Sequence, residues 1–186
     1  MENGNRGIMI LIIEICNQKF HYFEFVKPIQ DILKRNNFEF ITMHYKNLDQ
    51  DIISQVDKII ISGTSLKDNI FLKDIDYFNW IKKFCKPILG ICGGMHLLGL
   101  IFNGKLKKQQ EIGLTLVSFK NKFLGISGKQ EVYELHNFLV ESKYFEIFAE
   151  SKKCVQAVKH FKQPYFGVLF HPEVRNKEII VNFLKN

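Results

Sequence analysis

Short apolar runs alternate with amphipathic stretches over the first hundred residues. The apolar runs are rich in isoleucine and end at polar or glycine residues, which predicts buried strands at 8–15, 38–43, 56–61 and 87–91. Apolar residues at helical spacing predict helices at 26–37, 71–84 and 95–102. Regular alternation of strands and helices predicts an α/β fold whose mostly parallel central sheet is flanked by helices.

The pattern changes after Gly104. Strand-like segments then follow one another without long helices between them, which predicts a small antiparallel extension at 113–124, 130–139 and 154–159. Residues 165–170 are expected to return to the main sheet, and 177–184 to form a closing helix. The sequence has no repeat and no linker-like tract, so residues 1–186 are expected to form a single domain, with residues 1–7 flexible.

Composition narrows the class of protein. The chain has 186 residues, is 46% hydrophobic and carries a formal charge of +7, which suits one globular core with a lysine-rich surface. Arginine is scarce and basic residues are not interleaved with aromatics, so no nucleic-acid binding is expected. The apolar run at 8–13 is too short to cross a membrane, ends at Glu14 and has no cleavage site, so a cytoplasmic protein is expected.

The four cysteines are scattered along the chain. They are Cys16, Cys85, Cys92 and Cys154. Their spacing includes no C-x-x-C pair and lacks the density of a disulfide scaffold, so neither a metal site nor a disulfide framework is expected. All except Cys92 are expected to be packing residues.

Cys92 lies in the segment Gly90-Ile91-Cys92-Gly93-Gly94, directly after an apolar strand. The glycines allow a tight strand–turn–helix, because a residue without a Cβ atom tolerates close backbone approach. A thiol at the start of a helix is favoured in its nucleophilic thiolate form. The segment therefore predicts the cysteine version of a nucleophile elbow.

A second segment supplies the other two groups that cysteine chemistry needs. The strand at 165–170 leads directly into His171, and Pro172 marks the end of that strand. Glu173 is two residues further and points to the same side, so it can orient the imidazole. Ser62, Cys92 and His171 each follow a strand of the predicted sheet, whose carboxyl ends meet at one ligand-binding mouth. His171 is therefore expected at that mouth rather than in the core.

These segments together resemble the class I glutamine amidotransferases. Residues 88–96 look like the elbow of that family, and 170–174 look like its triad segment. Residues 62–63, 110–113 and 134–137 fall where the family has its oxyanion loop, its Glu-x-Gly segment and its Ser-His segment. Residues 156–168 are most similar to the glutamine amidotransferase subunits of GMP synthases.

The resemblance implies a flavodoxin-like fold and hydrolysis of glutamine to glutamate and ammonia through a thioester. Cys92, His171 and Glu173 would form the catalytic triad. The implied oxyanion-hole and substrate-binding residues are Gly63, Thr64, Gly93, His96, Glu111, His136 and Asn137. No metal or cofactor is implied, and the ammonia would pass to a separate ATP-dependent synthetase, as in GMP synthase.

The chain departs from the family at four places, one of which is Gly93, where the family usually has a larger residue. His96 and Leu169 each stand where the family usually has glutamine, and Ser62-Gly63-Thr64-Ser65 replaces a Gly-Gly-Pro loop. The loss of a hydrogen-bonding side chain from a substrate pocket changes selectivity. Two alternatives therefore stay open: a stand-alone cysteine hydrolase of a γ-glutamyl or related amide, and a catalytically degenerate relative that regulates a partner.

Overall fold

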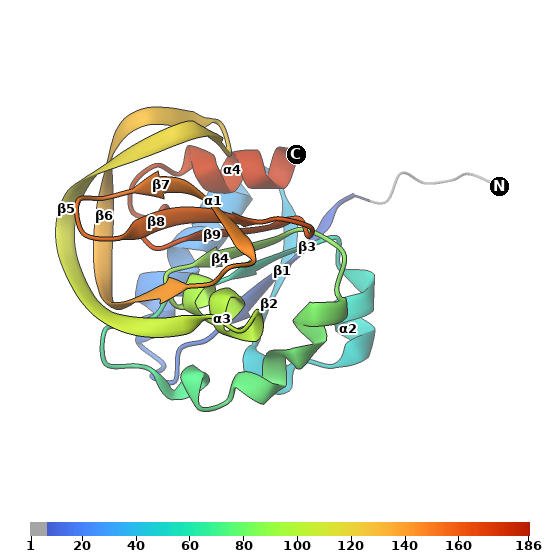
Figure 1. Ribbon diagram of the computed structural model, residues 1–186. Helices are drawn as coiled ribbons and strands as arrows, with labels where there is room; N and C mark the ends of the chain where they lie inside the picture. Colours follow the sequence, from blue (N-terminus) through green and yellow to red (C-terminus); the bar gives the residue numbers. More distant parts are fainter. Residues whose placement is uncertain (1–6) are drawn as a thin grey trace.

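The computed structural model describes residues 7–186, which form one strongly curled sheet with helices on both faces (Figure 1). The strands follow the order β2-β1-β3-β4-β9-β8-β7-β5-β6. Their bounds are β1 (Met9–Glu14), β2 (Glu39–His44), β3 (Lys58–Ile61), β4 (Ile88–Ile91), β5 (Lys105–Phe123), β6 (Ile126–Glu141), β7 (Phe145–Glu150), β8 (Val155–His160) and β9 (Tyr165–Val168). Of the terminal segment expected to be flexible, only Gly7 lies within the described residues.

The sheet is mixed, so the expectation of a mostly parallel sheet is wrong. The pairs from β2 to β9 are parallel, and the pairs from β9 to β6 are antiparallel. The antiparallel part is also not small, because β5 and β6 have 19 and 16 residues and form one long ribbon. An antiparallel hairpin needs no crossover helix, so a ribbon of this length can form from adjacent segments.

The helices cover the parallel half on both faces. Side chains alternate along β1, so that Ile10 and Ile12 pack toward one face, and Leu11 and Ile13 toward the other. The first face is covered by α1 (Lys27–Arg35) and α4 (Glu178–Lys185), and the second by α2 (Gln50–Gln55), the 3₁₀ helix η4 (Ile75–Lys83) and α3 (Gly93–Ile101). Shorter helical turns are η1 (Tyr22–Val26), η2 (Tyr45–Asn47) and η3 (Ile70–Leu72).

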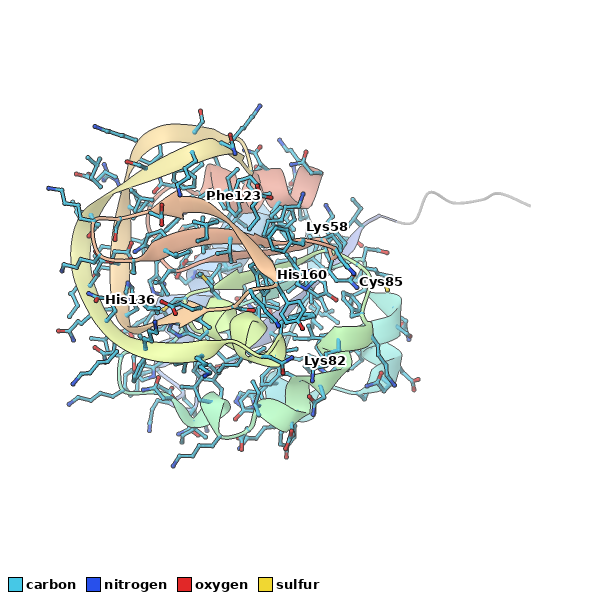
Figure 2. The ribbon with its side chains drawn as sticks, viewed as in Figure 1. Lys58, Lys82, Cys85, Phe123, His136 and His160 are labelled. Atoms are coloured by element: carbon cyan, nitrogen blue, oxygen red, sulfur yellow. The ribbon has the colours of Figure 1, made fainter. Side chains whose placement is uncertain are left out.

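A buried lysine fixes the C-terminal helix to the sheet. Lys58 on β3 donates from Nζ to the carbonyl oxygens of Phe183 and Leu184, at 2.9 Å each (Figure 2). These carbonyls lie in the last turn of α4, where carbonyl groups lack helical partners and a cation is favourable. None of the helices within residues 7–186 has the length and apolar character that crossing a bilayer requires.

Candidate active site

The elbow at Cys92 has the strand–turn–helix form that its glycines predict. Cys92 lies between β4 and α3 with φ 47° and ψ −102°, a strained conformation that non-glycine residues rarely adopt. A Cβ atom added to Gly90 would lie 2.6 Å from backbone atoms of Gly94, so glycine is required where the strand and the helix approach. The turn places the Cys92 thiol at the carboxyl end of β4, beside the N-terminus of α3.

His171 and Glu173 form a buried pair beyond the end of β9. Glu173 Oε1 accepts a hydrogen bond from His171 Nδ1 at 2.7 Å, and both side chains are almost fully buried. Burial by itself lowers the pKa of His171, but the charges of Glu173 and Cys92 act in the opposite direction and hold it well above 6.5. The expectation that His171 lies outside the core is wrong, because β6 covers it: its backbone N–H donates to the carbonyl of Tyr133.

Gly63 shows how closely Cys92 and His171 converge. A Cβ atom added to Gly63, just after β3, would lie 2.6 Å from Cε1 of His171 and 3.5 Å from Cβ of Cys92. The ends of β3, β4 and β9 therefore bring a backbone turn, a thiol and an imidazole into one small volume. Glu173 binds Nδ1 of the imidazole, and Nε2 has no hydrogen-bond partner among the described residues.

Replacing Gly63 with alanine is expected to lower the rate of glutamine hydrolysis by about 10²-fold, because a displacement of a catalytic group by about 1 Å costs that much. The added methyl group would push the imidazole of His171 away from its position beside Cys92. The matched control is Gly7→Ala, whose Cβ would lie 3.8 Å from the nearest neighbouring atom. Steady-state kinetics and thermal unfolding of both variants measure the effect, and an unchanged rate for Gly63→Ala would contradict this geometry.

A narrow cavity beside the thiol contains most of the residues predicted for substrate binding. Its lining includes Cys92, Gly93, Thr64, His96, His136 and Asn137. The amide of Asn137 donates to the carbonyl of Leu66 at 3.0 Å and thereby connects β6 to the loop after β3. A separate apolar cavity between α3 and the turn that joins β6 to β7 is lined by none of these six residues.

His96 is a neutral residue in this cavity. Burial lowers the pKa of His96 to about 4, and its Nε2 lies 2.8 Å from the carbonyl oxygen of Phe138 on β6. A carbonyl only accepts hydrogen bonds, so Nε2 carries the proton and donates it. The side chain therefore ties α3 to β6 at the position where the family usually has glutamine.

Glu111 lies outside the cavity, in a buried polar cluster behind it. Its Oε2 accepts hydrogen bonds from Ser151 Oγ at 3.0 Å and from Gln156 Nε2 at 2.9 Å. His136 reaches both places: it lines the cavity, and its Nε2 lies 3.7 Å from Glu111 Oε2. Figure 2 shows His136 enclosed by the curl of β5 and β6.

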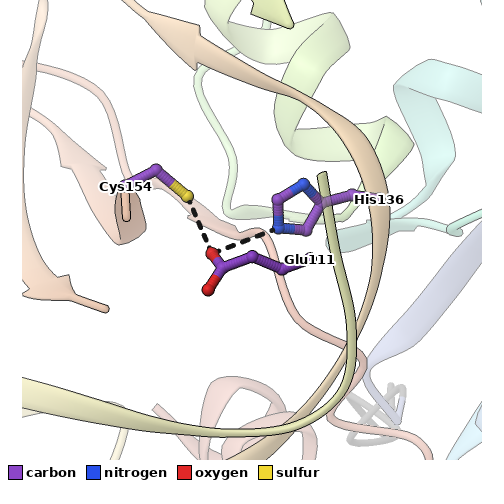
Figure 3. Close-up of side chains that lie close together, drawn as sticks. All are labelled: Glu111, His136 and Cys154. Atoms are coloured by element: carbon purple, nitrogen blue, oxygen red, sulfur yellow. Dashed lines mark hydrogen bonds and ion pairs between the residues drawn. The ribbon is translucent and has the colours of Figure 1, made fainter. Parts of the chain in front are cut away.

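The site residues predicted from the sequence did not include several members of this cluster. Glu134 on β6 and Gln156 on β8 are fully buried, and Cys154 donates to Glu111 Oε2 at 3.1 Å (Figure 3). A polar residue within an apolar strand, such as Gln156, is the signal that could have found them. The expectation that Cys85 packs in the core is wrong, because its side chain is exposed in the loop before β4.

The chain is similar to known proteins both in sequence and in fold. The family model for glutamine amidotransferase class I matches residues 21–186. A glutamine-hydrolysing GMP synthase subunit from Methanobrevibacter smithii is 35% identical over 105 residues, which are 52% of this chain and 55% of that protein. The match therefore spans little more than half the length of that relative. The corresponding subunit from Picrophilus torridus is 33% identical over 149 residues, which are 75% of this chain and 79% of that protein.

A solved structure has the same fold. The crystal structure of a candidate GMP synthase subunit from Thermoplasma acidophilum superposes with a TM-score of 0.85 at 23% identity, covering 97% of this chain and 94% of that one. The match of the family model over most of the chain, together with the Picrophilus torridus relative, establishes the family. The chain belongs to the class I glutamine amidotransferases.

Proposed function

We propose that this protein hydrolyses glutamine to glutamate and ammonia, with Cys92 as nucleophile, His171 as general acid and base, and Glu173 as the residue that orients His171. The observation that carries the proposal is the convergence at Gly63 of the thiol and of the imidazole held by Glu173. A nucleophile beside a base that is itself oriented by a carboxylate is the arrangement that acyl transfer needs.

The reaction proceeds in two halves. The Cys92 thiolate attacks the side-chain amide carbon of glutamine, and the oxyanion is held by backbone N–H groups of Gly93 and of the loop at 63–64. The amide nitrogen then takes a proton from the imidazolium of His171 as the C–N bond breaks, and it leaves as ammonia. In the second half, His171 removes a proton from water, which attacks the thioester and releases glutamate and the thiolate.

Residues in the cavity and behind it are assigned supporting roles in this proposal. Thr64, His96 and Asn137 line the space that the glutamine would occupy, and His136 closes one wall of it. Glu111 supports His136 from behind rather than touching the substrate, since it lies in the buried cluster.

We further propose that the ammonia passes to a separate ATP-dependent synthetase. Two relatives at 33–35% identity are named as subunits of a glutamine-hydrolysing GMP synthase. These names support the proposal that the partner of this chain is a synthetase that aminates a nucleotide. Residues 7–186 would act as one domain, and a reducing cytoplasm would keep the Cys92 thiol free.

The test is release of glutamate from glutamine by the purified chain, first by itself and then mixed with the synthetase component of a GMP synthase. We expect turnover that rises when the synthetase is present, and covalent labelling of Cys92 by a glutamine-like diazoketone. Absence of both turnover and labelling in the mixture would overturn the proposal. Hydrolysis of γ-glutamyl amides without hydrolysis of glutamine would show that the substrate is a different amide, while the proposed thioester mechanism would still hold.

Replacing His96 with glutamine restores the residue that the family usually has at this position and thereby tests the role of His96 in the pocket. Glutamine has an amide N–H that can donate to Phe138 as His96 does, so the link between α3 and β6 should survive. We expect the KM for glutamine to fall or to stay within about tenfold, equivalent to about 1.4 kcal/mol. A larger rise in KM, measured with kcat in the same assay, would show that His96 serves a ligand other than glutamine.

A further inference from the structure

Three side chains that can bind a metal ion meet behind the cavity. They are Glu111 on β5, His136 on β6 and Cys154 just before β8, and each offers one ligand atom within 4.8 Å of the others (Figure 3). Glu111 and His136 are direct cross-strand partners in the β5–β6 ribbon, whereas Cys154 comes from the turn after β7. The curl of the sheet brings these segments together.

A fourth side chain, that of Glu134, lies beside His136 in this cluster. Glu134 is 0% exposed, and neither of its carboxylate oxygens has a hydrogen-bond partner within residues 7–186. Its Oε2 lies 3.2 Å from Nε2 of His136, a buried nitrogen that also has no such partner. Buried polar atoms of this kind are costly and call for an explanation, such as a bound ion.

The donor set indicates which ion would fit. One thiolate, one imidazole and two carboxylates are all ligands of Zn²⁺, which binds four such groups in a closed tetrahedral site when its role is structural. Bonds of about 2.0–2.3 Å to such ligands separate the donor atoms by roughly 3.3–3.6 Å. The observed separations are similar: 3.1 Å from Cys154 Sγ to Glu111 Oε2, and 3.7 Å from that oxygen to His136 Nε2.

We propose that Glu111, His136 and Cys154 bind a structural Zn²⁺ ion, and that Glu134, which lies next to His136, completes the site as its fourth ligand. Two carboxylates and a thiol face a single imidazole, and a divalent cation would favour the thiolate and offset the negative charge in a largely buried place. The site would fasten the β5–β6 ribbon to the β7–β8 hairpin. Its ligands do not belong to the proposed triad, so the ion itself has no direct role in the hydrolysis proposed above.

The site would also hold one wall of the active site. Between Glu134 and His136 lies Leu135, whose carbonyl oxygen is 3.6 Å from Cys92 Sγ. The neighbouring carbonyl of Tyr133 accepts the backbone N–H of His171. Fixing Glu134 and His136 on a metal ion would therefore fix the β6 backbone that contacts both proposed catalytic residues.

The competing arrangement is a hydrogen-bond network without an ion. Glu111 Oε2 already accepts hydrogen bonds from Ser151, Cys154 and Gln156. That network satisfies Glu111, whereas Glu134 has only the imidazole of His136 beside one carboxylate oxygen, at 3.2 Å, and its other oxygen has no hydrogen-bond partner among the residues that the structure describes. Direct measurement of metal binding distinguishes the two arrangements.

The experiment uses Co²⁺ as the probe, because its thiolate and tetrahedral absorption bands report the ligands directly. The full-length chain is freed of metal with a chelator and titrated with Co²⁺. We expect a sulfur-to-cobalt band that saturates at about one ion per chain, and its loss when Zn²⁺ is added in excess. Zn²⁺ should also raise the unfolding temperature of the wild type, since it binds only the folded site.

The matched variants separate this site from the other thiols. Cys154→Ser should lose the sulfur-to-cobalt band, whereas Cys85→Ser and Cys92→Ser should keep it. If Cys154→Ser does not fold, Glu134→Gln, which preserves volume, should weaken Co²⁺ binding at least tenfold. A wild type without the band, a band that depends on Cys92, or unchanged binding by Glu134→Gln would each overturn the proposal.

Discussion

Replacing Cys92 with alanine is expected to abolish glutamine hydrolysis, lowering kcat by about 10⁴-fold or more, because no other group can form the thioester. The variant should keep the fold, because alanine is smaller than cysteine and the hydrogen bond that the thiol donates to Leu135 is weak, at 3.6 Å. Glutamate release under saturating glutamine measures the loss. Binding of glutamine should survive, because the N–H groups of the loop at 63–64 and of α3 remain.

Cys85→Ala is the control for this experiment. Cys85 is an exposed cysteine on the far side of the molecule from His136 in Figure 2. Its removal should leave the rate unchanged and should leave labelling by the diazoketone intact. If Cys92→Ala kept a substantial rate while Cys85→Ala lost it, the assignment of the nucleophile would be wrong.

Replacing His171 with alanine is expected to cause a loss of kcat of similar size, about 10⁴-fold. His171 is the group placed to protonate ammonia and to activate water, and it is the imidazole that Glu173 orients. The variant should remain folded, as measured by circular dichroism. Wild-type turnover in His171→Ala, or its global unfolding, would count against the proposed role.

The stability that His171 contributes to the wild-type protein should depend on pH in a defined direction. The pKa of His171 in the folded protein lies well above its ordinary value of 6.5, so the protonated imidazole stabilises the native state. That contribution is complete below about pH 6.5 and is lost as the pH rises through the folded value. The difference in unfolding free energy between wild type and His171→Ala, measured by denaturant titration, should therefore shrink as the pH rises.

Local patterns predicted the elements that position the candidate triad. The apolar runs that became β1, β3, β4 and β9 were identified because strands buried on both faces contain little but apolar residues. The elbow was recognisable because Gly90 and Gly94 meet requirements of the backbone that only glycine satisfies. The candidate triad was recognisable because each of its residues follows or adjoins such a strand.

The same approach failed where one face of a strand is exposed. Polar residues alternate with apolar ones along β5, so the segment at 105–112 lacked a continuous apolar run and the ribbon was predicted too short. The helix predicted at 71–84 is instead the 3₁₀ helix η4 within 75–83. Spacing of apolar residues does not distinguish these two helix types over so few turns.

Short segments were enough to identify the candidate nucleophile, its candidate base and the family resemblance, because the geometry of these segments is local. The burial of His171, the contact of His96 with the β6 backbone, and the meeting of Glu111, His136 and Cys154 beside Glu134 depend on residues that are far apart in the chain. The contact of His96 with Phe138 and that of Cys154 with Glu111 join residues 42 and 43 positions apart through the curl of the sheet. No short segment encodes that curl, since it belongs to the whole β5–β6 ribbon, which pairs with β7 and contacts α3.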